Sequence, residues 1–210
     1  KLYGRGTADD KGPAVAALYA MRAVKELNIP LKKNVRLILG TDEECGSSDI
    51  AHYYADEEEA PMTFSPDANF PVVNTEKGGL NGHFTAEWES SEALPKLVSL
   101  EAGIKVNVVP GKAKAVVQGV DVRVLEETGK KTEEETGISF EFSVEEEIAV
   151  ITAVGAGAHA SMPEDGNNAL TGLLVFLTNL PLAECDQVKM LRSLLELMPH
   201  GDVTGKAMGI

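Results

Sequence analysis

Apolar residues in the first third of the chain follow helical spacing in some segments and strand-like runs in others. Residues 14–27 place apolar side chains at helical spacing after a glycine-rich turn at residues 4–12, and predict one amphipathic helix. The short apolar run at residues 35–40 predicts a buried strand that ends in polar residues. A second helix is expected at residues 48–55. Such alternation of helices and strands is typical of a parallel α/β sheet.

Beyond about residue 78, apolar and polar residues alternate, which is typical of strands with one solvent-exposed face. We expect such strands at residues 80–89, 105–109, 113–118, 138–143 and 147–153. Helical spacing is expected at residues 120–136, 169–180 and 186–198. The second part is therefore predicted to be an α+β sandwich of the ferredoxin-like kind, in which helices cover an antiparallel sheet. We place the boundary between the two parts between residues 77 and 80.

The chain of 210 residues contains 33 acidic and 19 basic residues, and its formal net charge is −14. This charge repels phosphate groups over most of the surface, so we expect neither nucleic acid nor an anionic membrane as a partner. The acidic runs at residues 56–59 and 133–135 are interpreted as solvated helix ends or loops rather than as binding features.

The two cysteines, Cys45 and Cys185, have the spacing of neither a disulfide framework nor a thiolate zinc site. This usage indicates a reducing compartment, and no apolar run approaches the ~18–20 residues that cross a bilayer. We therefore expect a cytoplasmic protein. Because the chain begins at Lys1 within strand-like sequence, we interpret it as an internal fragment of a longer protein.

Three acidic clusters in the first part lie beside apolar segments, and they are Asp9-Asp10, Glu43-Glu44 and Asp67. Ligands bind at the carboxyl ends of the strands in a parallel sheet, so these segments are expected to converge at one edge. Crowded carboxylates repel one another, and a divalent cation makes such crowding favourable. Taken singly, each residue would more often be a helix cap or a turn residue. Their joint placement favours a metal site.

Each cluster is part of a longer motif: Gly-Arg-Gly-Thr-Ala-Asp-Asp-Lys-Gly-Pro at 4–13, Thr-Asp-Glu-Glu at 41–44, and Ser-Pro-Asp-Ala-Asn-Phe-Pro at 65–71. In this order they resemble the motifs of peptidase family M20. These dinuclear zinc peptidases include bacterial Xaa-His dipeptidases, carboxypeptidase G and succinyl-diaminopimelate desuccinylases.

The resemblance implies roles for four side chains of the first part. It implies that Asp9 bridges two zinc ions and that Glu44 and Asp67 are further metal ligands. It also implies that Glu43 is the general base that acts on a metal-bridging water. Manganese and cobalt are alternatives to zinc.

Segments of the second part resemble the lid of the same family: Gly-Ala-Gly-Ala-His-Ala-Ser-Met-Pro at 155–163, Gly-Asn-Asn-Ala at 166–169, and Asn-Val-Val-Pro at 107–110. The resemblance implies that His159 binds the substrate and stabilises the oxyanion of the tetrahedral intermediate. It implies that Asn107 also contacts the substrate. Residues 1–78 are thus expected to be part of a catalytic, metal-binding domain, and residues 79–210 a lid domain.

The family pattern also contains an upstream His-x-Asp motif, a C-terminal histidine and a lid arginine, and residues 1–210 match none of them. His52, His83 and His200 match no motif and are interpreted as ordinary surface or helix-flank residues. Zinc prefers at least one imidazole or thiolate among its ligands. This chain alone is therefore expected to bind zinc weakly and to be inactive.

The resemblance implies hydrolysis of dipeptides by a two-zinc exopeptidase, with a small peptide as substrate and either a monomer or a homodimer formed through the lid. An N-acyl amino acid amidohydrolase or desuccinylase is the alternative enzyme, because the metal motifs do not distinguish the acyl group. A non-catalytic binding or dimerisation module is a further alternative. The Glu43-Glu44 pair disfavours it, because a binding module needs no general base.

Overall fold

The computed structural model describes residues 1–7, 9–68, 72–76, 78 and 81–209. The chain divides into two compact units, Lys1–Gly78 and Gly79–Ile210, called unit 1 and unit 2 and considered separately. Most of the boundary predicted between residues 77 and 80, and the end of the third motif at 69–71, lie outside the described residues. In the described part of the chain, no helix has the length and apolar character needed to cross a membrane.

Unit 1 contains two helices and a short 3-10 turn: α1 (Lys11–Glu26), η1 (Glu43–Cys45) and α2 (Ser48–Asp56). Both helices lie where the helical spacing predicts them. Neither helix has a buried residue, and the apolar Val15 and Leu18 of α1 are 52% and 53% exposed. The described part of unit 1 therefore does not cover the apolar stripe that makes α1 recognisable in the sequence.

The strand predicted at residues 35–40 is wrong, because these residues form no strand. A strand is held by hydrogen bonds to a neighbouring strand, and the described residues of unit 1 contain no second strand. The Arg36 guanidinium instead donates to the Tyr53 hydroxyl of α2 and forms an ion pair with Glu57 at 3.1 Å. This segment is thus linked to α2 by side chains, and the predicted parallel sheet is not seen in the described part of unit 1.

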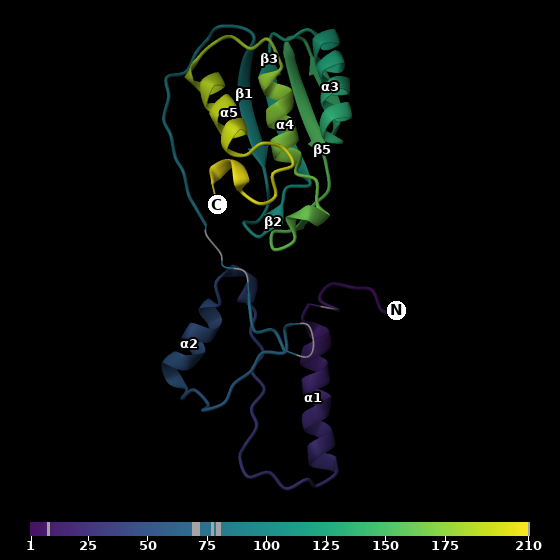
Figure 1. Ribbon diagram of the computed structural model, residues 1–210, viewed down its shortest axis with the longest axis vertical. Coiled ribbons are helices and arrows are strands. Elements are labelled where there is room, and N and C mark those ends of the chain that lie inside the picture. Colours follow the sequence, from purple (N-terminus) through teal and green to yellow (C-terminus); the bar gives the residue numbers. More distant parts are fainter. Residues whose placement is uncertain (8, 69–71, 77, 79–80, 210) are drawn as a thin grey trace. The chain divides into compact units, whose positions relative to one another are not determined.

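Unit 2 is built on a four-stranded antiparallel sheet in the order β1-β3-β5-β4 (Figure 1). Its strands are β1 (Lys96–Ala102), β3 (Lys112–Gln118), β4 (Ser139–Glu145) and β5 (Ile148–Val154). The register places Ala115 of β3 opposite Ile151 of β5, and Val117 opposite Ala149. All four side chains are buried and lie on the same face, because alternate residues of a strand point to opposite faces.

Three helices pack together over this face of the sheet (Figure 1), namely α3 (Val122–Thr136), α4 (Ala169–Thr178) and α5 (Asp186–Leu197). Helix α4 contacts β3 and β5 and is also packed against α3 and α5. Eight of its 10 residues are buried, which explains why its sequence is apolar on nearly all sides. At the centre of the core, the Phe176 ring of α4 stacks on Phe140 with a centroid separation of 4.8 Å.

The helices and the strands β3, β4 and β5 of unit 2 confirm the predicted elements. The strand predicted at residues 105–109 is limited to β2 (Val108–Val109), the strand predicted at 80–89 is wrong, and one strand of the four-stranded sheet was missed. Residues 81–89 form no strand, and Leu80 lies outside the described residues. Strand β1 was not predicted, because its pairing has an irregularity between Leu97 and Ser99 that interrupts the period-two pattern. Leu97 is buried, and the adjacent Val98 is 52% exposed.

The ferredoxin-like prediction agrees with unit 2 only in part. The run β3-α3-β4-β5-α4 follows the order β-α-β-β-α, which lacks only the last strand of that fold. On the side of β3 away from β5, the neighbouring strand is β1, which precedes the run in the chain. Unit 2 is therefore a mixed α/β unit with a small antiparallel sheet.

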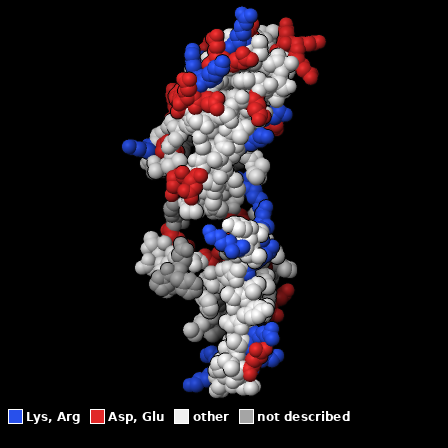
Figure 2. Space-filling view, turned by 90° about the vertical axis from the view of Figure 1, so that its right-hand side faces the viewer, with Lys and Arg blue, Asp and Glu red and all other residues white. Residues whose placement is uncertain are grey.

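The acidic runs lie on solvated surfaces, as the sequence predicts. Residues 56–59 and 133–135 are all exposed, whereas Thr132 and Thr136 on the other side of α3 are buried. On the face shown in Figure 2, acidic and basic side chains are interspersed over unit 2. On this face, the acidic side chains of unit 2 therefore have basic side chains among them.

Candidate active site

Asp9 and Asp10 lie where the glycine-rich turn meets the start of α1. The N–H and the hydroxyl of Thr7 both donate to the Gly4 carbonyl, which closes the turn. A Cβ on Gly12 would lie 2.7 Å from the Thr7 carbonyl oxygen, so the turn can pack this closely on the helix only against glycine. Both carboxylates are therefore held beside a helix N-terminus, where the partial positive charge favours them.

Glu43 and Glu44 are exposed on the 3-10 turn η1. The turn is held at its start by Asp49, whose Oδ2 accepts hydrogen bonds from the N–H groups of Thr41 and of Asp42. The bond from the Thr41 N–H lowers the pKa of the Asp49 carboxyl, which favours the ionised form that holds the turn. The glutamate pair is thus presented by a locally ordered segment.

Asp67 lies within the electric field of the other two motifs. Much of the residue is exposed, yet loss of water around its carboxyl raises its pKa, and the negative charges of Asp10, Asp9 and Glu44 raise it further. Like charges have this effect only when they are close. Carboxylates of all three motifs are therefore near enough for their charges to interact.

Among the described residues, one oxygen of Asp10 has no hydrogen-bond partner. Its Oδ1 atom is shielded from solvent, and no described residue bonds to it. A buried carboxylate oxygen without a partner is costly. A cation at the carboxylate cluster would compensate this charge.

These side chains fit a divalent cation only in part. Carboxylate oxygens suit magnesium, calcium and manganese, whereas zinc usually takes them together with histidine or cysteine. Within the described residues, no group of three or more His, Cys, Asp or Glu side chains is placed closely enough to hold a metal ion. Asp9, Glu44 and Asp67 would therefore need a rearrangement or additional ligands to complete a metal site.

In unit 2, a separate two-stranded ribbon is formed by two short strands, β2 (Val108–Val109) and β6 (Ala158–His159). His159 pairs with Val108, and the Ala160 N–H donates to the Asn107 carbonyl oxygen at 2.8 Å. His159 is exposed and Asn107 is half-buried. The structure therefore brings together the two residues that the sequence marks as substrate contacts.

Main-chain hydrogen bonds fix this ribbon to the rest of unit 2. Ala156 and Asn167 exchange two such bonds, at 2.9 and 2.8 Å, and the Gly155 N–H donates to the Gly111 carbonyl at 3.0 Å. A Cβ on Gly155 would lie 2.2 Å from the Asn167 carbonyl oxygen. Glycine at position 155 is thus required for this close approach.

Ser161 contacts His159, and sequence reasoning assigned it no role. Its Oγ lies 2.7 Å from the imidazole Nδ1, and its N–H donates to the same nitrogen at 3.2 Å. The serine is part of the motif at 155–163. Its position two residues after the histidine is the signal that could have identified it.

His200 is not an ordinary surface residue, which corrects the interpretation from the sequence. It is half-buried, with Nδ1 2.9 Å from the Thr171 hydroxyl and Nε2 3.1 Å from the Thr136 carbonyl oxygen. The Asn167 side-chain amide donates to the same carbonyl at 3.0 Å. His200 therefore links the end of α3 to the start of α4, and its partners are too distant in sequence for any motif to reveal this role.

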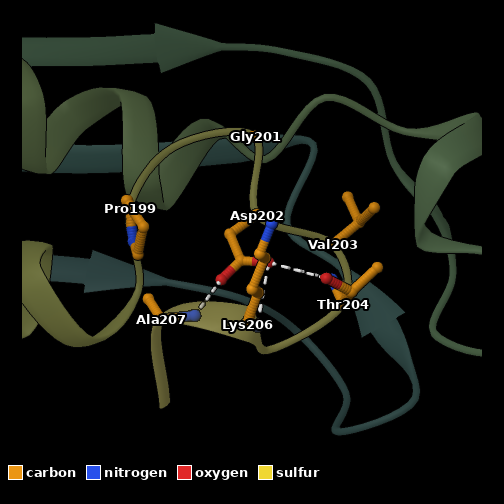
Figure 3. Close-up of a pocket in the computed structure, with 7 residues that line it drawn as sticks. All are labelled: Pro199, Gly201, Asp202, Val203, Thr204, Lys206 and Ala207. Atoms are coloured by element: carbon orange, nitrogen blue, oxygen red, sulfur yellow. Dashed lines mark hydrogen bonds between the residues drawn. The ribbon is translucent and has the colours of Figure 1, made fainter. Parts of the chain in front are cut away.

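The segment that follows α5, together with the start of η3 (Lys206–Met208), lines a hollow of about 560 Å³ (Figure 3). In this segment, the Asp202 carboxylate accepts hydrogen bonds from the Thr204 N–H and hydroxyl and from the N–H groups of Lys206 and Ala207. The loop itself supplies hydrogen-bond donors to both carboxylate oxygens. We therefore interpret Asp202 as a residue that stabilises the turn, and the hollow as a consequence of this turn rather than a binding site.

These hydrogen bonds, the one from the Ala207 N–H foremost, lower the pKa of Asp202 from 3.8 to about 2. A carboxyl with a lower pKa in the folded state contributes stability above its unfolded pKa and loses it as the pH falls through the folded value. We therefore expect Asp202→Asn to lower Tm at neutral pH, and the difference from wild type to shrink between about pH 4 and 2. Thermal unfolding followed by circular dichroism at several pH values measures this difference. A Tm difference that stays constant with pH would contradict the role of the ionised carboxylate.

Residues 1–160 match the family model described as Peptidase family M20/M25/M40. The chain is 36% identical over 212 residues to "Putative dipeptidase YtjP" of Bacillus subtilis (strain 168), covering 100% of the chain and 45% of the relative. It is 35% identical over 210 residues to "Beta-Ala-Xaa dipeptidase" of Lactobacillus delbrueckii subsp. lactis, covering 100% of the chain and 44% of the relative. The chain therefore spans less than half the length of these curated relatives.

Proposed function

The chain belongs to peptidase family M20/M25/M40, and from this we propose that the full-length protein hydrolyses dipeptides with the help of two metal ions. The observation that carries the proposal is the effect of Asp10, Asp9 and Glu44 on the pKa of the Asp67 carboxyl, because it indicates that carboxylates of the three motifs are near enough to interact. The names of the two relatives support a dipeptide as the substrate.

In this proposal, Asp9, Glu44 and Asp67 would hold the metal ions, with Asp9 shared by both. Zinc is the proposed metal, with manganese or cobalt as alternatives, and when bound it would polarise the substrate carbonyl and acidify water. The carboxylates contribute negative charge that a dication compensates. Carboxylates without an imidazole are a poor zinc site, so we propose that residues 1–210 alone bind zinc weakly and are inactive.

Glu43 is the proposed general base. It accepts a proton from the attacking water and then donates this proton to the leaving amine of the cleaved peptide bond. Its position next to Glu44 on η1 supports this role, since consecutive side chains of a turn point in different directions. One glutamate can therefore hold metal while its neighbour handles the proton.

The β2–β6 ribbon supplies the proposed substrate contacts. His159 is exposed and can donate a hydrogen bond to the substrate carbonyl oxygen as negative charge develops there. Asn107 is held beside it by the Ala160 N–H. We propose that residues 79–210 are a lid domain of the ferredoxin-like kind and that residues 1–78 are part of a parallel-sheet catalytic domain. We propose a cytoplasmic protein that acts as a monomer or as a homodimer formed through the lid.

Assays of the full-length protein on matched substrates test this proposal. We expect dipeptides to be hydrolysed, EDTA to abolish activity, and zinc, manganese or cobalt to restore it. N-acyl amino acids and N-succinyl substrates with the same C-terminal residue are the comparison. A higher kcat/KM for these acyl substrates would instead identify an amidohydrolase. Full activity after removal of all metal would contradict the metal-dependent mechanism.

A further inference from the structure

The contact between Ser161 and His159 determines which imidazole nitrogen carries the proton. The Ser161 N–H points at Nδ1 from 3.2 Å, and a main-chain amide can only donate. Nδ1 is therefore the acceptor in this bond. Because a neutral imidazole has one donor and one acceptor nitrogen, the proton lies on Nε2.

We infer that Ser161 is a positioning residue that keeps His159 in the Nε2–H tautomer, so that Nε2 is the donor to the substrate oxygen. This inference rests on the proposed function. The Ser161 hydroxyl, with Oγ 2.7 Å from Nδ1, donates to the same nitrogen and adds to the effect of the amide. A proton on Nδ1 would instead face the Ser161 N–H, and two donors would oppose each other.

The main chain around His159 holds the Ser161 amide in this direction. The Met162 N–H donates to the His159 carbonyl at 3.0 Å, which closes a tight turn over residues 159–162. His159 is paired with Val108, and the Ala160 N–H is bonded to the Asn107 carbonyl. The start of the turn is thus anchored to β2 and Asn107, and the turn itself is closed by a main-chain bond, so the amide presented to Nδ1 is part of the folded backbone.

The tautomer matters for catalysis because only an N–H can stabilise negative charge on the substrate oxygen. The nitrogen that donates must be the one that faces the substrate, and Nδ1 already faces Ser161. Loss of one well-placed donor to an oxyanion typically lowers kcat by about 10²–10³-fold. A serine that acts through the histidine has a smaller effect, set by the strength of a single hydrogen bond.

Nitrogen-15 NMR of the 210-residue chain, labelled at histidine, tests the tautomer directly. The chemical shifts of Nδ1 and Nε2 distinguish a protonated from an unprotonated nitrogen, and loss of one signal set in His159→Gln assigns the ring. We expect Nε2–H in wild type, and in Ser161→Ala a shift of the tautomer ratio toward Nδ1–H by about fivefold, the factor provided by one ordinary hydrogen bond. Ser161→Thr keeps the hydroxyl and should restore the wild-type ratio. Ser143→Ala, at an exposed position of β4, is the matched control.

A dominant Nδ1–H tautomer in wild type would overturn the inference. An unchanged ratio in Ser161→Ala would overturn it as well. These measurements need no activity, so they remain decisive even if the full-length protein does not hydrolyse dipeptides and the proposed function fails.

Kinetics of the full-length protein provide the second test. Ser161→Ala should lower kcat by about fivefold with little change in KM, because the hydrogen bond is needed most when charge develops in the transition state. His159→Gln should retain more activity than His159→Asn, since the longer amide reaches the position of Nε2 and the shorter one that of Nδ1. Equal losses in these two variants, or a Ser161→Ala effect confined to KM, would contradict the assignment.

Discussion

Replacing Glu43 by glutamine in the full-length protein is expected to lower kcat for dipeptide hydrolysis by about 10²–10⁴-fold, the range in which general bases contribute. Glutamine has nearly the same shape, but its amide cannot take a proton from the attacking water. The bound metal should remain, because the proposed ligands Asp9, Glu44 and Asp67 are unchanged. Steady-state kinetics and metal analysis of the purified variant measure the two effects separately.

Two neighbouring variants provide the controls for this experiment. Glu58→Gln makes the same chemical change at an exposed position after α2 and should leave kcat unaltered. Glu44→Gln should lower the metal content, because it removes a proposed ligand. Wild-type turnover in Glu43→Gln, or loss of metal without loss of the chemical step, would refute the assignment of the base.

Phe176→Ala is expected to destabilise unit 2 by about 3–5 kcal/mol, the usual cost of removing a fully buried aromatic side chain. Phe176 is 0% exposed, and its ring lies 4.8 Å from Phe140 and 5.8 Å from Phe142, between centroids. Truncation would leave a cavity between α4 and β4 and would remove the aromatic pairing. Urea unfolding followed by circular dichroism measures the loss, which is a large fraction of the ~5–15 kcal/mol by which most domains are stable.

Phe84→Ala is the matched control, because Phe84 is 94% exposed in the same unit. Its effect should stay within about 0.5 kcal/mol, as for most surface substitutions. A similar destabilisation by both variants would show that Phe176 is not the centre of the core. A small effect of Phe176→Ala alone would show that α4 can close over the missing ring.

Local sequence patterns predicted the helices of unit 2 well because helix formation depends on neighbouring residues. The range 186–198 corresponds to α5 at Asp186–Leu197, and the range 169–180 to α4 at Ala169–Thr178. At the start of α4, the Asn168 side chain accepts hydrogen bonds from the N–H groups of Leu170 and Thr171. Such caps connect residues only two or three positions apart, so they are readable from sequence.

Strands were predicted less well because a strand is stabilised by a partner elsewhere in the chain. The apolar run at 35–40 has no pairing partner in the described part of unit 1, and Leu39 remains 68% exposed. The reverse error occurred at β1, where an irregular register exposes Val98 and interrupts the alternation that marks a strand. In both cases the hydrophobic pattern of one segment does not show whether, or in which register, another segment pairs with it.

The sequence by itself determined which residues can carry the proposed chemistry. The motifs around Asp9, Glu43, Glu44 and Asp67 are recognisable as short strings, as is the glycine-rich approach to His159. These features depend on residue type and local spacing, which the linear sequence contains in full.

Only the tertiary structure decided how these residues meet. It paired the segments of Asn107 and His159 on one ribbon, placed the Asp67 carboxyl in the field of Asp9 and Glu44, and aimed the Ser161 N–H at Nδ1. Hydrogen bonds and charge interactions depend on distance and direction, and the folded backbone sets both.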